Sequence, residues 1–307
     1  MKRIYLIIIA IIVCVFALPV HAQKKIKAMI ATGQDGSHWW KGANDAIQKT
    51  LENTGLFTVD IITTPDWGGD MTLFNPDFKK YDLVIVNYGG ETWAEKTRKN
   101  FERYVADGGG VVIIHSSVVP MDDWAEYNKI IGLGAWNGRD EKFGPYVYWK
   151  NDRFVYDYSP GWAGHHALQR PFTVEHRNTE HPITKGLSPV WEHFKDELYS
   201  KLRGPAQNME ILATTYDALE LDGSGRDEPV MWTVNYGKGK VFVTLMGHVG
   251  NDPELCYSMW CTGFQVTLSR GAEWAATGQV TQAVPKDFPS KDILTFRKEY
   301  KAPFNAY

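Results

Sequence analysis

Cysteine is scarce in this chain of 307 residues, and no C-x-x-C pair is present. The three cysteines are Cys14, Cys256 and Cys261. Without paired cysteines, the chain has no motif for a thiolate zinc site. Cys256 and Cys261 fall five positions apart in a predicted helix, which places their side chains on different faces. We therefore expect two buried thiols rather than a disulfide.

Nucleotide-binding motifs and a surplus of basic residues are also missing. Neither G-x-G-x-x-G nor G-x-x-x-x-G-K-[ST] occurs, so no motif supports a nucleotide cofactor. The formal net charge is -3 at pH 7, and this mild acidity argues against nucleic acid as a partner. Aromatic residues are plentiful, with 12 tryptophans and 15 tyrosines. Such side chains stack on sugar rings and also fill cores, so composition leaves both uses open.

One long apolar run opens the chain. Two basic residues precede an apolar segment over residues 4–18, and Ala22 ends a motif of small residues. This pattern predicts a secretory signal peptide over residues 1–22, cut after Ala22. The run is short for a membrane span, and the residue before Cys14 is too large for a lipoprotein signal. We expect an exported protein, periplasmic or secreted, with no membrane association after cleavage.

Strands and helices are predicted to alternate through the following part of the chain. Apolar residues recur at helical spacing over 38–53 and 92–107, and short apolar runs flank these segments. The predicted strands cover residues 26–31, 57–62, 83–86, 111–114, 209–214, 229–235 and 241–246. This alternation indicates an α/β fold, a three-layer flavodoxin-like sandwich around a mostly parallel sheet.

The remaining segments complete the predicted organisation. Residues 141–180 alternate aromatic and polar side chains, which predicts a small β-rich insertion, and Phe172–His176 is typical of an edge strand. Another helix is predicted over 253–275. Residues 280–307 show no clear periodicity and form a C-terminal extension. The α/β domain then spans residues 23–279, and the sequence leaves the oligomeric state open.

Histidines follow several of the predicted strands. Three glycines and the apolar run 111–114 lead into His115, and a second apolar strand ends in Gly247-His248. His38 lies in the loop after the first strand. The carboxyl ends of parallel strands meet at one edge of a sheet, where α/β proteins bind ligands. His166 and Glu197 come from the inserted middle and can close over this edge.

These imidazoles and the carboxylate suit two kinds of chemistry. They can transfer protons near neutral pH, or they can bind a divalent metal with nitrogen and oxygen ligands. A structural role is the alternative for each residue: His115 can cap its strand, and Glu197, within a predicted strand over 195–199, can pair with a basic residue. Ser37 is a predicted N-cap. Ser116 follows a strand as a nucleophile would, but the G-x-S-x-G motif is missing.

The order and spacing of several short segments resemble the trehalose-utilisation (ThuA-like) family, of the class I glutamine amidotransferase-like superfamily. The resemblance spans roughly residues 26–276. The segments that carry it are 38–40, 51–55, 108–117, 164–166, 181–187, 196–199, 229–232, 236–241, 247–248 and 274–275. It implies an amidotransferase-like fold in which His115 stands where true amidotransferases carry the nucleophilic cysteine. His248 matches their later histidine by order. We expect amidotransferase activity to be absent.

The resemblance also implies a function in carbohydrate catabolism, with a disaccharide, a glycoside or its 3-keto form as the small-molecule partner. In this interpretation His115 and His248 form an acid/base pair, and Glu197 orients or ligates. The predicted substrate contacts are His38, Trp39, His166 and Ser116. A divalent metal at the same residues is the alternative mechanism, and the sequence does not settle whether a metal is bound. A non-catalytic sugar-binding protein on the same fold is the alternative function.

Overall fold

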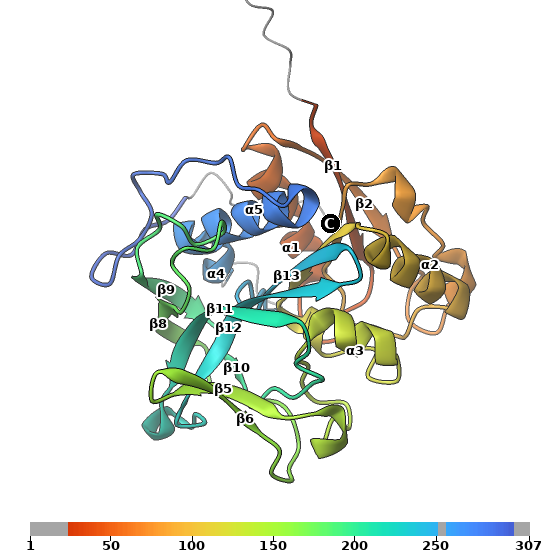
Figure 1. Cartoon of the computed structure of the whole chain (residues 1–307). Helices are drawn as coiled ribbons and strands as arrows, with labels where there is room; N and C mark the ends of the chain where they lie inside the picture. Colours follow the sequence, from red (N-terminus) through yellow and green to blue (C-terminus); the bar gives the residue numbers. More distant parts are fainter. Residues whose placement is uncertain (1–23, 251–255, 298–307) are drawn as a thin grey trace, which may run out of the picture.

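A single large sheet organises the protein in the computed structural model, which describes residues 24–250 and 256–297 (Figure 1). The predicted signal peptide therefore lies outside the described residues. The strands follow the order β2-β1-β3-β4-β13-β12-β11-β8-β9. Their bounds are β1 Ile26–Thr32, β2 Phe57–Thr63, β3 Leu83–Val86, β4 Gly110–Ile114, β8 Arg170–His176, β9 Val190–Asp196, β11 Met209–Asp217, β12 Arg226–Tyr236 and β13 Gly239–Thr244.

One half of the sheet, from β2 to β13, is parallel, as predicted. Its strands β3 and β4 are buried at every position, which explains their continuous apolar sequences. Alternate residues face two separate hydrophobic clusters. Helices α1 (Trp40–Glu52) and α5 (Thr262–Thr277) contribute to one cluster, and α2 (Glu95–Ala106) and α3 (Ala125–Ile131) to the other. The fold is therefore an α/β sandwich with helices on both faces.

The other half is antiparallel. A tight turn joins β12 to β13, and β11 and β8 follow toward the edge strand β9. The predicted β-rich insertion is present as the hairpin of β5 (Tyr146–Lys150) and β6 (Arg153–Asp157), together with the short strand β7 (His165–His166). Phe172–His176 is not an edge strand, because β8 pairs with β11 on one side and β9 on the other. Long-range pairing of this kind is not visible in local alternation.

Two predictions about the C-terminal part need correction. The predicted helix 253–275 begins in residues outside the described part and is then divided, because Cys261 adopts an extended conformation between α4 (Tyr257–Trp260) and α5. Cys256 and Cys261 therefore do not share one helix, although both are buried thiols. Residues 280–297 of the C-terminal extension pack on the domain: Thr281 binds Glu273 of α5 through hydrogen bonds, and Phe288 contacts Trp191 of β9.

The carboxyl ends of the parallel strands β1, β3, β4 and β13 lie at one edge of the sheet. At this edge, the loops that follow these strands meet the segment between β9 and the short strand β10 (Tyr199–Ser200). None of the helices in the described part has the length and apolar character needed to cross a membrane.

Candidate active site at the carboxyl edge of the sheet

Four side chains from four separate loops converge at this edge. They are His38, His115, Glu197 and His248, and one nitrogen or oxygen atom of each lies within 4.8 Å of the others. Oε2 of Glu197 is the common neighbour: it lies 3.7 Å from Nε2 of His38, 3.6 Å from Nε2 of His115 and 3.7 Å from Nε2 of His248. We call these residues the four-residue cluster. The structure thus brings His115 and His248 together as the parallel sheet predicts.

His115 is fixed by its backbone and by one carbonyl group. It is the first residue after β4, in a 3₁₀-turn, and its φ of 44° is a left-handed conformation that is strained for a residue other than glycine. Nδ1 lies 2.6 Å from the carbonyl oxygen of Leu245. Because a carbonyl can only accept, Nδ1 carries the hydrogen, and in the neutral ring Nε2 presents a lone pair toward Glu197. This buried Nε2 atom has no hydrogen-bond partner within the described residues.

His38 is oriented by Asp35 in the loop after β1. Nδ1 of His38 lies 2.9 Å from a carboxylate oxygen of Asp35, so Nδ1 donates and Nε2 faces Glu197. Asp35 also accepts the backbone N–H groups of Ser37 and His38 and the hydroxyl of Ser116. Ser37 is therefore not the N-cap, and helix α1 begins later, at Trp40. Burial acts to lower the pKa of His38, but the carboxylates of Asp35 and Glu197 raise it to about 9.

His248 follows β13 and is held through its ring by Gln169. The Gln169 amide nitrogen lies 3.1 Å from Nδ1 of His248. Burial lowers the pKa of His248 to about 4. Burial acts to raise the pKa of Glu197, but the nearby imidazoles of His115, His38 and His248 hold it far below its usual value. At neutral pH these shifts favour an ionised Glu197 carboxylate beside a protonated His38 and a neutral His248.

The four-residue cluster lies beside a cavity of about 640 Å³, in which His38, Glu197 and His248 line the wall. Tyr199 also lines it, and its ring centroid lies 4.4 Å from that of His115. Trp67, which is 57% exposed, and Trp136 are the tryptophans of the lining. The other lining residues are Asp35, Gly36, Ser37, Gly89, Ser116, Val119, Asn137 and His166. Such a volume suits a small organic ligand, and the lining mixes aromatic with polar groups.

The four residues predicted to contact substrate differ in their position relative to this cavity. His166 and Ser116 line the cavity, and Nδ1 of the partly exposed His166 lies 3.2 Å from Oε1 of Glu197. His38 belongs to the four-residue cluster itself. Trp39 is the exception. It is not among the described residues that line the cavity, and it packs against the hydrophobic cluster to which α1 contributes. A substrate contact of Trp39 stays a prediction, and the cavity lining gives it no support.

Sequence reasoning missed the residues that support the cluster. Asp35 was visible only as one of several turn residues, although an aspartate three positions before a histidine permits the observed hydrogen bond. Tyr199 and Gln169 carry no local signal, because each reaches the site through tertiary packing. Glu197 was placed within a predicted strand, but it lies in the break between β9 and β10. That break turns its side chain into the cluster.

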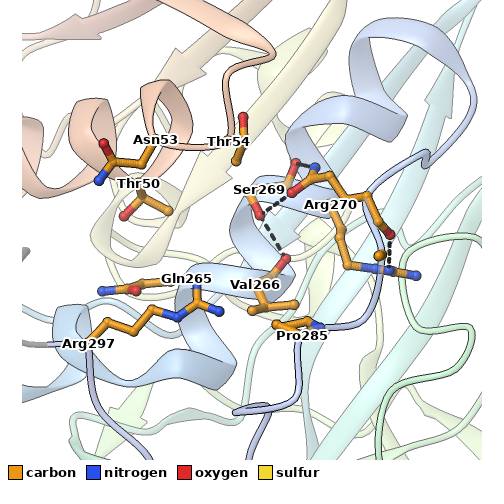
Figure 2. A pocket seen from close by; sticks show the side chains of 11 residues that line it. Thr50, Asn53, Thr54, Gln265, Val266, Ser269, Arg270, Pro285 and Arg297 are labelled. Atoms are coloured by element: carbon orange, nitrogen blue, oxygen red, sulfur yellow. Dashed lines mark hydrogen bonds between the residues drawn. The ribbon is translucent and has the colours of Figure 1, made fainter.

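A second cavity, of about 310 Å³, lies between α1, α5 and the C-terminal segment (Figure 2). Its lining is polar, with Thr50, Gln265 and Arg270 among its residues. The Arg270 guanidinium donates to the backbone carbonyl oxygens of four residues: Pro182, Ile183, Lys185 and Gln282. No histidine or carboxylate from the described residues lines this cavity. It therefore offers no acid, base or metal ligand.

The four-residue cluster fits a divalent cation. Tetrahedral zinc bonds to imidazole nitrogen at about 2.0–2.1 Å, which puts neighbouring ligand atoms about 3.4 Å apart. The three distances from Nε2 to Oε2 exceed this by a few tenths of an ångström and are too long for hydrogen bonds. Each pair of imidazole rings is nearly perpendicular, at 78–84°. The outer nitrogens of His38 and His115 donate to the Asp35 carboxylate and the Leu245 carbonyl, as those of metal-binding histidines do.

The comparisons with known proteins agree with this fold. The family ThuA, trehalose utilisation, matches residues 27–275, and the chain belongs to this family. It is similar to a ThuA-like protein of Parabacteroides merdae, with 47% identity and a TM-score of 0.87, over 90% of this chain and 99% of that one. A ThuA-like protein of Bacteroides uniformis shares the fold at 20% identity and a TM-score of 0.56, over 86% and 97%. No curated protein matches the chain.

Proposed function

We propose that the protein is an enzyme of carbohydrate catabolism that uses a divalent metal ion at the four-residue cluster. The observation that carries the proposal is the orientation of His38 and His115. Nδ1 is committed as a donor in both rings, so whenever a ring is neutral its Nε2 lone pair faces the anionic Oε2 of Glu197. Only a cation, either protons or a metal ion, makes that arrangement favourable.

The residues that would hold the ion are His38, His115, His248 and Glu197. A divalent ion there polarises a carbonyl or hydroxyl oxygen and lowers the pKa of a coordinated water. The protein's own groups fix the ligand geometry from behind, through Asp35, Leu245 and Gln169. His248 would coordinate through Nε2, so Nδ1 would carry a hydrogen and Gln169 would present its amide oxygen to it.

The substrate class follows from the family and from the cavity. The family is one of trehalose utilisation, and the cavity holds tryptophan rings beside polar groups. Trp67 and Trp136 would stack on sugar rings, while Ser37, Asn137 and His166 would bind hydroxyl groups. His166 would also accept and return the proton of the reacting carbon or oxygen, since it lines the cavity as a partly exposed residue outside the four-residue cluster. A disaccharide, a glycoside or its 3-keto form is the proposed substrate.

The architecture is proposed to be that of class I glutamine amidotransferases with altered chemistry. His115 occupies a strained turn directly after a buried parallel strand, where a nucleophile would stand in such an enzyme. An imidazole there cannot replace the cysteine thiolate, so glutamine hydrolysis is not proposed. The residues ahead of the described part are proposed to be a signal peptide that directs the protein to the periplasm or the exterior.

Proton transfer without a metal is the second candidate, because the same imidazoles and carboxylate permit it. His115 and His248 would then act directly as base and acid, as the sequence predicts. A protein that binds sugar without turnover remains the non-catalytic form of the proposal. Metal content separates the first candidate from the other two.

The test combines metal analysis with turnover. Protein purified without chelator or affinity tag is expected to hold one divalent ion per chain. It should convert trehalose or its 3-keto form, lose this activity to a chelator and regain it with the ion. His115→Ala and Glu197→Gln should remove both properties. His181→Asn is the matched control, because His181 packs on Trp274 of α5 and is not among the residues that line the cavity. Metal-free protein with full turnover would overturn the metal proposal, and sugar binding without any product would overturn the enzymatic one.

A further inference from the structure

The carboxylate of Asp196 lies directly beneath the four-residue cluster and is fully buried. Oδ1 accepts the backbone N–H of Glu197 at 2.7 Å and that of His248 at 3.1 Å. Oδ2 accepts the backbone N–H of Gly247 at 2.8 Å. One carboxylate thus binds the two chain segments that carry Glu197 and His248, which lie 51 residues apart in the sequence.

We propose that Asp196 is a positioning residue, which sets the separation between Glu197 and His248 and thereby the affinity of the cluster for its cation. The proposal rests on the proposed function of the same site. Asp196 does not touch the cavity, so its effect passes through the two backbone segments. The proposal adds to the site a residue that the family match does not identify.

His193 anchors this carboxylate from the other side. Nε2 of His193 lies 2.7 Å from Oδ2 of Asp196, and both side chains are fully buried. The His193 ring packs against Phe172 and Trp191, with centroids 5.1 and 5.9 Å away. Because these neighbours belong to the central sheet, Asp196 cannot follow the loops if they shift. The carboxylate is a fixed point to which both loops are bound.

The residues whose N–H groups Asp196 binds lie outside regular secondary structure. Glu197 stands in the break between β9 and β10, and Gly247 has a φ of 111°, which only glycine adopts readily. Residues 245–250 belong to no strand or helix. Losing the shared acceptor would leave buried N–H groups to be satisfied by water or by movement of the loops. Displacements of about 1 Å are enough to weaken a preorganised site strongly.

The experiment compares Asp196→Asn with the control Glu273→Gln in the full chain. Glu273 is also a buried carboxylate that accepts a backbone N–H, but it lies on α5 and binds Thr281, away from the site. The first measurement is amide hydrogen exchange at residues 197, 247 and 248. The second is the dissociation constant for Zn²⁺ and Co²⁺, with the visible spectrum of bound Co²⁺ reporting ligand geometry.

Asp196→Asn is expected to speed exchange at these three amides, to raise the dissociation constant about 10–100-fold and to change the Co²⁺ spectrum. Glu273→Gln should lower the melting temperature without any of these changes. Unchanged amide exchange in a folded Asp196→Asn protein would overturn the proposal. So would a change in melting temperature alone, because that is what a purely structural ion pair predicts.

His193→Gln is the second variant, in case Asp196→Asn fails to fold. It removes the anchor and leaves the carboxylate, so a smaller change in the same direction is expected. Amide exchange needs no metal and therefore separates two failures. If the wild-type protein binds no ion but exchange still responds to Asp196→Asn, the proposed metal function fails and the positioning role stands. If the ion binds equally well to both proteins, the positioning role fails alone.

Discussion

The carbonyl oxygen of Leu245 lies 2.6 Å from Nδ1 of His115, and this hydrogen bond joins residues 130 positions apart. It decides which nitrogen of His115 carries the hydrogen, and so turns a lone pair toward Glu197. A residue at the end of β13 thereby controls the chemistry of a residue at the end of β4. The parallel pairing of these strands is what places the two groups side by side.

His115→Asn and His115→Ala should separate the ligand from the backbone strain. Asparagine tolerates the left-handed conformation that His115 adopts, whereas alanine does not. We expect both variants to lose the bound ion, and we expect His115→Ala to be less stable than His115→Asn by about 1 kcal/mol. Metal analysis and thermal unfolding measure the two effects. Equal stability of the variants would contradict the assignment of strain to this position.

Asp35→Asn should weaken ion binding by about 10–100-fold, because the amide orients the His38 ring less firmly and no longer favours the hydrogen on Nδ1. Isothermal titration with Zn²⁺ measures the affinity. Asp70→Asn is the matched control, since Asp70 likewise accepts the N–H two residues ahead, at Thr72, but lies on the surface. A similar loss of affinity in both variants would mean that the effect is not specific to His38.

Trp67→Ala should change sugar affinity, whereas Trp39→Ala should change stability. Trp67 is exposed and lines the cavity, so its removal is expected to lower disaccharide affinity about fivefold and to leave stability unchanged. Trp39 packs beneath α1, so its removal should cost about 2 kcal/mol of stability and leave sugar affinity intact. Calorimetric titration and thermal unfolding give both values. Loss of sugar affinity in Trp39→Ala alone would contradict the placement of the sugar.

Glu228 should make stability depend on pH. Burial within β12 raises the pKa of Glu228 to about 7, above the value of about 4.5 expected in the unfolded chain. The unfolded chain therefore releases this proton first, and stability is lost as pH rises from 4.5 through 7. Glu228→Gln removes the effect and should stabilise the protein at pH 8, by about 3 kcal/mol at most, with little change at pH 4. Urea unfolding of the wild-type protein and Glu228→Gln at each pH measures the difference in their free energies of unfolding. Parallel pH profiles would refute the role of Glu228.

The parallel half of the fold and the meeting of its histidines followed from local sequence. The apolar runs before His115 and His248 are long enough to identify buried strands, and the rule for strand ends then brings the two residues to one edge. The position of β8 inside the sheet did not follow, because alternation in Phe172–His176 reports one buried face and not which strands lie beside it.

The supporting residues of the site were beyond sequence reasoning for a related reason. Asp196 and Gln169 act on His248 from segments that pair with it only in the folded chain. The packing of Trp39 against the core was not visible in the sequence, because an aromatic residue beside a histidine is equally common in a core. Trp39, the N-cap residue of α1, packs against the core, whereas His38 directly before it belongs to the four-residue cluster. Only the folded structure distinguishes these two environments.

His38, His115 and His248 extend from the parallel half of the sheet, whereas Glu197 follows β9 at the far antiparallel edge. A cation bound by these four side chains would cross-link the two halves of the sheet. Its binding energy would be lost only when both halves separate, so it would add to the cooperativity of unfolding as well as to its midpoint. At an ion concentration 100 times the dissociation constant, this linkage contributes about 2.7 kcal/mol. Scarcity of the ion would then reduce the lifetime of the folded protein as well as its turnover.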